Sequence, residues 1–193
     1  TFYHIFESKS AVLTELTVFM FENQFGIAQQ FIDPDASPAM LYAVETAIQL
    51  ALVEQNENLR DIYVEAYTQP ALLGMIQQRT AKVISRIFRP YLPDCEACDF
   101  YEMEIGTAAL MRGYMARPCD MYFTLERKIQ RFLTMSLRIY KVPDAEQRAI
   151  LDGLRGLDFR GIASQVMQRL FAQLSMKYDF TLSAPSEENA EAE

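Results

Sequence analysis

The sequence predicts an all-α protein, a helical bundle of about seven or eight helices with no convincing strand. Apolar residues recur three and four positions apart along most of the 193 residues, as in helices that bury one face. Glycine is scarce, at 7 residues, whereas turn-rich β folds need many. Prolines separate the periodic stretches, which suits a bundle with short connections. A chain of this length, half of it hydrophobic, can bury a large core.

Capping residues and prolines set the expected helices in the first half. Ser8 stands where an N-cap belongs before a long apolar-periodic segment. Ser37 and Pro38 place a cap before a proline at the first helical position. The pair Pro90 and Pro93 ends a later helix. The expected helices cover about 8–32, 38–54, 59–67 and 70–89.

The second half is punctuated in the same way. Pro118 should break one helix, and Asp120 is a candidate cap for the next. Asp144 and Gln147 resemble a capping box after Pro143. The expected helices cover about 99–116, 120–141, a segment from 144 to the glycines at 153 and 156, and 159–178. The polar, acidic residues 183–193 are expected to be disordered.

Charge and cysteine content narrow the classes of protein. The formal net charge is −8, so the chain as a whole lacks the basic surface of a DNA-binding domain. Three cysteines in a chain of this size make no disulfide framework. No signal-peptide pattern and no apolar run long enough to span a membrane is visible. We therefore expect a cytoplasmic protein without a membrane partner.

The first nine residues, Thr-Phe-Tyr-His-Ile-Phe-Glu-Ser-Lys, carry a family resemblance. The stretch resembles the end of the helix-turn-helix in tetracycline-repressor-like (TetR family) regulators. There, a recognition helix runs into a Tyr-x-x-Phe turn and a Ser-Lys pair opens the fourth helix. In this chain Tyr3, Phe6, Ser8 and Lys9 fill those places, over about a tenth of the sequence.

The resemblance implies a domain division and a set of DNA contacts. Residues 1–9 would be the remnant of the helix-turn-helix, most of it lying upstream, and 10–182 the ligand-binding and dimerisation domain. Thr1 would end the recognition helix, and Tyr3, His4 and Lys9 would contact DNA phosphates, as hydrogen-bond donors can. The alternative is ordinary packing of Tyr3 and His4. By this interpretation, the residues present should bind operator DNA weakly or not at all.

The middle helices of this family enclose an effector pocket, and here they carry aromatic, methionine and hydroxyl side chains. Such a lining suits an apolar or aromatic ligand, with a few polar groups to orient it. A plain core is the alternative for each residue. The candidate ligand-binding residues are Tyr63, Tyr67, Met75, Arg79, Phe100, Met103, Glu104, Thr107, Met111 and Tyr114.

Two later helices have more apolar residues than one buried stripe needs. Met135, Leu137 and Ile139 lie beside the main stripe of the expected helix 120–141. Such a surplus favours a homodimer interface over additional intrachain packing. The candidate interface residues are Leu125, Ile129, Phe132, Leu133, Ile162, Val166, Leu170 and Leu174.

Other chemistries find little support. Cys95 and Cys98 form a C-x-x-C pair, but Asp94, Glu96 and Asp99 beside it disfavour a thiolate, so incidental loop cysteines are favoured over a redox or metal site. A single histidine, His4, cannot easily serve a catalytic triad, and no Gly-rich phosphate loop or metal-ligand spacing appears. We expect no enzyme, no metal and no cofactor.

The sequence thus predicts a ligand-responsive transcriptional regulator, with repression favoured over activation. Its helical C-terminal domain would bind a small apolar or aromatic effector and dimerise, and its partners would be operator DNA, the effector and a second copy. The alternative is a helical small-molecule carrier or enzyme with an apolar cavity, unrelated to DNA.

Overall fold

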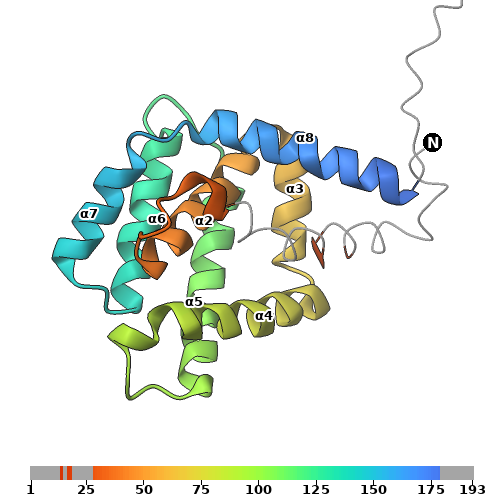
Figure 1. Ribbon diagram of the computed structural model, residues 1–193. Helices are drawn as coiled ribbons and strands as arrows, with labels where there is room; N and C mark the ends of the chain where they lie inside the picture. The colour runs from red at the N-terminus through yellow and green to blue at the C-terminus, as the bar shows by residue number, and fades with distance from the viewer. Residues whose placement is uncertain (1–13, 15–16, 19–27, 179–193) are drawn as a thin grey trace, which may run out of the picture.

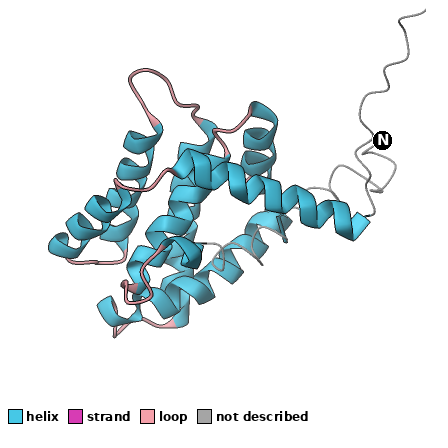
Figure 2. Cartoon of the chain, turned by 45° about the horizontal axis from the view of Figure 1, so that its top comes forward, coloured by secondary structure: helices cyan, strands magenta, loops and turns pink. Residues whose placement is uncertain are grey.

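The protein is an all-α bundle, as the sequence predicts. The computed structural model describes residue 14, residues 17–18 and residues 28–178, and within these it holds seven α-helices and no strand (Figures 1 and 2). Residues 14, 17, 18 and 28 are helical, which agrees with the expected helix 8–32 where that helix can be seen. The predicted DNA contacts of residues 1–9 and the expected disorder of 183–193 lie outside the described residues.

The helices follow one another with short connections. A 3₁₀ turn at Gln29–Phe31 (η2) precedes the first complete helix, and a second one, Arg89–Tyr91 (η3), follows the third. The α-helices are α2 (Pro38–Leu52), α3 (Glu57–Ala66), α4 (Pro70–Phe88), α5 (Ala97–Ala116), α6 (Leu125–Ile139), α7 (Asp144–Leu154) and α8 (Phe159–Tyr178).

One predicted cap is present, and a second cap lies where only a turn was predicted. Ser37 Oγ accepts a hydrogen bond from the Met40 amide at 3.3 Å, and Pro38 occupies the first turn of α2. Asn56 Oδ1 accepts from the Leu59 amide at 2.8 Å, so the polar break before α3 is a cap as well as a turn. These side chains satisfy amide groups that have no partner inside their own helix.

The start of α6 and the capping of α7 differ from the prediction. The Asp120 carboxylate accepts from the amides of Tyr122 and Phe123, both at 2.8 Å, and so closes a turn instead of starting a helix. Helix α6 begins five residues later, where Thr124 accepts from the Arg127 amide. In α7 the predicted capping role of Gln147 is wrong, because its amide donates to the Val142 carbonyl at 2.7 Å.

Helix α2 forms the centre of the bundle. Every residue from Tyr42 to Val53 is buried, and α4, α5, α6, α7 and α8 all pack against it. In Figure 1, α8 crosses one end of the bundle and α4 the other, with α6 and α7 side by side. The aromatic rings of Phe88 and Tyr140 stack at 4.0 Å beside α2, and Tyr42 meets the Phe88 ring edge-on at 5.1 Å.

A buried ion pair fixes the loop between α5 and α6. Lys128 is fully buried on α6, and its Nζ lies 2.5 Å from Glu54 Oε1 just beyond α2. The same ammonium donates to the Arg117 carbonyl, and the Cys119 amide donates to Glu54 Oε2 at 3.1 Å. Burial alone would raise the pKa of Glu54, but hydrogen bonds from Lys128 and Cys119, with the charges of Lys128 and Arg60, hold it below its ordinary value.

Candidate ligand-binding site

A small cavity lies in the middle of the bundle, between α2, α4, α5 and α6. Its volume is about 30 Å³, which is room for a group of the size of a water molecule or an ammonium ion. Aromatic rings, hydroxyls and two carboxyl groups share its wall. The lining residues are Tyr42, Glu45, Thr46, Gln49, Tyr67, Thr80, Glu104, Thr107, Ala108, Met111 and Phe132.

The polar groups of this cavity satisfy one another. Thr107 Oγ1 lies 2.8 Å from Glu104 Oε2 and 2.9 Å from the Tyr140 hydroxyl. On the opposite wall the Gln49 amide donates to the Glu45 carboxyl, and the Tyr67 hydroxyl lies 3.4 Å from Gln49 Oε1. Glu45 and Glu104 are 3% and 4% exposed. Two carboxyl groups are therefore held inside the protein by uncharged partners.

Burial shifts the ionisation of the groups in this cavity. It raises the pKa of Glu104 to about 8, although hydrogen bonds with Thr107 and Tyr140 oppose the shift. Burial and the nearby charge of Glu104 also raise the pKa of Glu45 well above its ordinary value. Tyr42 and Tyr67 have raised pKa values, mainly through burial. Near neutral pH the Glu104 carboxyl thus holds its proton for the most part.

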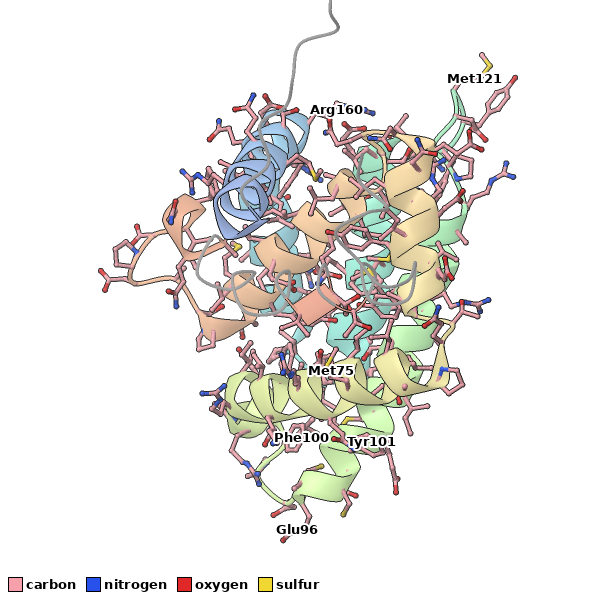
Figure 3. All side chains as sticks on the ribbon, turned by 90° about the vertical axis from the view of Figure 1, so that its right-hand side faces the viewer. Met75, Glu96, Phe100, Tyr101, Met121 and Arg160 are labelled. Carbon is pink, nitrogen blue, oxygen red and sulfur yellow. The ribbon has the colours of Figure 1, made fainter. Side chains whose placement is uncertain are left out.

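The structure brings together four of the ten predicted ligand-binding residues. Tyr67, Glu104, Thr107 and Met111 all line the cavity. The other six lie outside this lining: two are in the core, three are partly buried and one is exposed. Tyr63 is in the core; Phe100 is also in the core, with the Arg89 guanidinium 5.1 Å over its ring, and Figure 3 shows it near the start of α5.

The remaining four are half-buried or exposed. Met75 and Met103 are partly buried against the core, and Tyr114 packs its ring on Phe132. Arg79 is exposed on α4 and is not among the residues that line this cavity, so its role as a charged ligand contact stays a prediction. The charge available in the cavity is acidic.

Sequence reasoning missed the contribution of α2. Tyr42, Glu45, Thr46 and Gln49 form one wall of the cavity, on a helix that is otherwise apolar. A glutamate, a threonine and a glutamine within five residues of an otherwise apolar helical stretch are the signal that could have found this wall, since buried polar side chains need partners.

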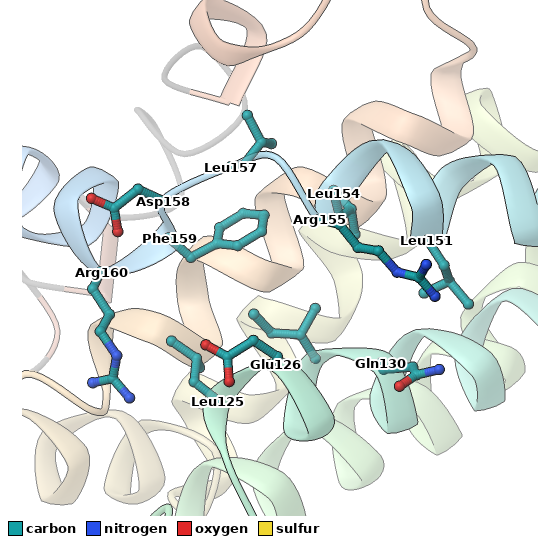
Figure 4. Close-up of a pocket in the computed structure, with 11 residues that line it drawn as sticks. Leu125, Glu126, Gln130, Leu151, Leu154, Arg155, Leu157, Asp158, Phe159 and Arg160 are labelled. Atoms are coloured by element: carbon teal, nitrogen blue, oxygen red, sulfur yellow. The ribbon is translucent and has the colours of Figure 1, made fainter.

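A larger cavity lies between α6, α7 and the start of α8. Its volume is about 240 Å³, and none of its residues was predicted as a ligand contact. The lining is apolar at its base, with charged groups at its edge (Figure 4): Leu125, Glu126, Ile129, Gln130, Leu151, Leu154, Arg155, Leu157, Asp158, Phe159 and Arg160. Phe159 points between α6 and the turn that follows α7 (Figure 4).

Five of the eight predicted dimer residues face the interior of their own chain. Leu125, Ile129, Phe132 and Leu133 on α6 and Ile162 on α8 are between 0% and 6% exposed, so their assignment to an interface is wrong. Val166 is half-buried, and the side chains of Leu170 and Leu174 lie outside the described residues. The strongest apolar stripe of α6 was needed for the core. The exposed apolar residues of α6 are instead Met135 and Ile139.

The remaining features are the cysteines, possible metal-ligand groups and possible membrane-spanning helices. Cys95, Cys98 and Cys119 are free thiols. No group of three or more histidine, cysteine, aspartate and glutamate side chains suited to a metal ion occurs in the part of the chain that the structure describes. Among the described helices, none combines the length and apolar character needed to cross a membrane.

Comparison with known proteins identifies no relative. No protein-family model, no curated protein and no solved structure matches the chain.

Proposed function

We propose that the protein is a ligand-responsive transcriptional regulator of the TetR type, which acts as a repressor. Its helical domain binds a small effector and forms a homodimer, and its DNA partner is an operator. The resemblance of residues 1–9 to the end of a helix-turn-helix supports the DNA-related part of this proposal. The helical bundle behind them is the architecture that such a sensing domain requires.

The observation that carries the sensing role is the polar cavity inside the core. Protein interiors are close-packed, and a few convergent polar groups in an apolar wall are typical of ligand sites. Tyr67, Glu104, Thr107 and Met111, selected from the sequence, meet there with four residues of α2. Four helices contribute to one small space, so an occupant would act on their relative positions.

Such a wall can couple binding to regulation. An effector changes the population of two arrangements only if it binds one of them more tightly. The cavity as described has room for a head group of a ligand, about 30 Å³, and a larger effector would favour an arrangement with its walls further apart. In the proposed regulator, that arrangement has a different affinity for operator DNA.

A substitution that fills the cavity tests the sensing role. Ala108 lines the cavity on α5 and is 3% exposed, so Ala108→Val places two additional carbon atoms in the space. We expect compounds that raise the melting temperature of the natural protein to lose at least tenfold in affinity for the variant. The measurement is a thermal-shift screen of aromatic and lipophilic compounds, followed by calorimetric titration of the hits.

The neighbouring residue provides the matched control. Ala109 is exposed on the same helix, so Ala109→Val adds the same atoms outside the cavity and should leave every affinity unchanged. Compounds that bind both variants as they bind the natural protein would contradict the proposed effector site.

We place the proposed dimer contact on the surface formed by α5 and α6. Met135 and Ile139 of α6 are 47% and 37% exposed, and Met135 Sδ lies 3.9 Å from the Tyr114 hydroxyl of α5. Exposed Gly106 and Gly113 on α5 have nothing within 4 Å of an added Cβ, so a second helix can approach closely there. Small residues beside large apolar ones favour helix packing, and a two-fold axis brings the same surface together twice.

Charging this surface should break the dimer. We expect Met135→Lys combined with Ile139→Lys to shift the protein to monomer at micromolar concentration, because four buried ammonium groups would oppose association. Ala145→Lys is the control, because Ala145 is exposed on α7 and lies outside the surface formed by α5 and α6. Sedimentation velocity reports both. A natural protein that stays monomeric at high concentration refutes the dimer.

The larger cavity favours a second candidate function, a helical carrier of small molecules unrelated to DNA. Its 240 Å³ and apolar base suit a lipophilic guest better than the central cavity does. The two functions separate in the same titrations. The carrier is favoured by compounds whose affinity is unchanged in Ala108→Val but lost in Leu154→Glu. Leu154 lines the larger cavity and not the central one.

A further inference from the structure

The described residues give the central cavity an acidic wall without a counter-charge. Glu45 comes from α2 and Glu104 from α5, and the two carboxyl groups face the same space from opposite helices. Among the described residues that line the cavity, none is a lysine, an arginine or a histidine. Folded proteins usually pair a buried carboxyl with a cation or replace it by an apolar group, because burying it costs stability.

The hydrogen bonds around these carboxyls leave capacity for another donor. Among the described residues, Glu104 is hydrogen-bonded with Thr107 at 2.8 Å and with Tyr140, and Glu45 accepts from the Gln49 amide. A carboxylate has about four acceptor positions, so each group has positions beyond these bonds. The rings of Tyr42, Tyr67 and Phe132 line the same space and can offer their negative faces to a cation.

We propose that this cavity receives the protonated nitrogen of an organic amine, held between Glu45 and Glu104 and enclosed by aromatic rings. The available volume of about 30 Å³ fits an ammonium head without rearrangement. The apolar remainder of the amine would extend along Met111 and Phe132. This inference rests on the proposed function, because it names the ligand class of the same effector site.

The ionisation of the cavity gives the proposal a characteristic pH dependence. Burial raises the pKa of both carboxyls. Among the described residues, the groups facing them that can titrate are the phenols of Tyr42, Tyr63, Tyr67 and Tyr140, which burial keeps protonated. At pH 7 an ammonium ligand would displace a proton from Glu104, whose pKa is about 8. Binding would therefore release a proton, and the affinity would rise between pH 6 and pH 8.

The test compares 2-phenylethylamine with 2-phenylethanol, which has the same size but no charge. Calorimetric titration of the natural protein at pH 8 should show the amine binding at least tenfold tighter than the alcohol. In Glu45→Gln and in Glu104→Gln this preference should fall to less than threefold, while Glu102→Gln, exposed on α5, keeps it. Titrations at pH 7 in buffers of different ionisation enthalpy should show proton release with the amine only.

The outcomes distinguish a wrong ligand class from a wrong effector site. Equal affinity for amine and alcohol, or a preference that survives both glutamine variants, overturns the amine proposal. Absence of amine binding overturns it as well. If neutral compounds then bind and Ala108→Val abolishes their binding, the effector site stands and only the ligand class fails. If no compound responds to Ala108→Val, the proposed function itself fails. Thermal melts of the variants confirm that each one is folded.

Discussion

Replacing Lys128 with methionine is expected to lower the free energy of unfolding by about 3 kcal/mol, because it leaves Glu54 charged and buried without its closest partner. The Lys128 side chain is 0% exposed and that of Glu54 7% exposed, so water cannot replace the lost ammonium. Arg60, 3.4 Å from Glu54 Oε2, keeps part of the compensation, which places the effect near the lower end for broken buried pairs.

Two further variants separate the ion pair from packing. Lys82→Met changes an exposed lysine on α4 and should alter stability by no more than about 0.5 kcal/mol. Adding Glu54→Gln to Lys128→Met removes the unpaired charge, so the double variant should be more stable than Lys128→Met alone. Urea denaturation followed by circular dichroism measures all three. A Lys128→Met variant as stable as Lys82→Met would show that the pair contributes nothing.

The same ion pair explains why one helix start could not be predicted. Asp120 and Thr124 are both good N-cap residues, and local sequence does not separate them. The long-range contacts of Lys128 with Glu54 and with the Arg117 carbonyl hold residues 117–123 as a loop against the end of α2. Tertiary contact thus decided where α6 begins, whereas the helices themselves followed from apolar spacing, prolines and caps.

The dimer residues were misplaced for a related reason. The residues of α6 with the clearest helical spacing, Leu125, Ile129, Phe132 and Leu133, are those that the chain buries first in its own core. A partner can contact only what remains, here Met135 and Ile139. The surplus beside the main stripe was therefore the better guide to a surface. Leu137, the third residue of that surplus, is itself buried.

The cavity was half predictable. Residues of α5 were selected because the family resemblance places an effector pocket on the middle helices, where aromatic, methionine and hydroxyl side chains gather. The wall contributed by α2 was missed because its apolar periodicity was strong enough to suggest plain core. Its three buried polar residues, Glu45, Thr46 and Gln49, can be recognised as a cavity wall only once the fold places Glu104 of α5 in the same lining. That pairing spans 59 positions between Glu45 and Glu104, which no local pattern records.

The pH dependence of stability should report the buried carboxyl of Glu104 directly. Its pKa is about 8 in the folded protein against an ordinary value of 4.5, so the unfolded chain ionises first as the pH rises. The unfolded state then binds fewer protons, and the stability contributed by this group falls between about pH 4.5 and pH 8. Below pH 4.5 the group is protonated in both states, and the full contribution is present.

Glu104→Gln should remove this dependence. Glutamine has nearly the same shape, can accept from Thr107 and never ionises, so the variant should match the natural protein at pH 5 to within about 1 kcal/mol. At pH 8.5 it should be more stable by about 2–4 kcal/mol, since each unit of pKa shift corresponds to about 1.4 kcal/mol. Urea denaturation at several pH values gives the free energy of unfolding of the natural protein and of the variant. Taking the difference between them removes the contribution of the groups that titrate alike in both.

Glu102 supplies the comparison on the same helix. Its side chain is exposed, so Glu102→Gln should leave stability unchanged to within about 0.5 kcal/mol at each pH. A Glu104→Gln variant whose advantage is the same at pH 5 and pH 8.5 would mean that the natural carboxyl titrates normally. The cavity would then be hydrated, and its acidic wall would impose no cost on the fold. A gain confined to high pH would instead show that the chain keeps a destabilising acid in its core, as binding sites often do at the expense of stability.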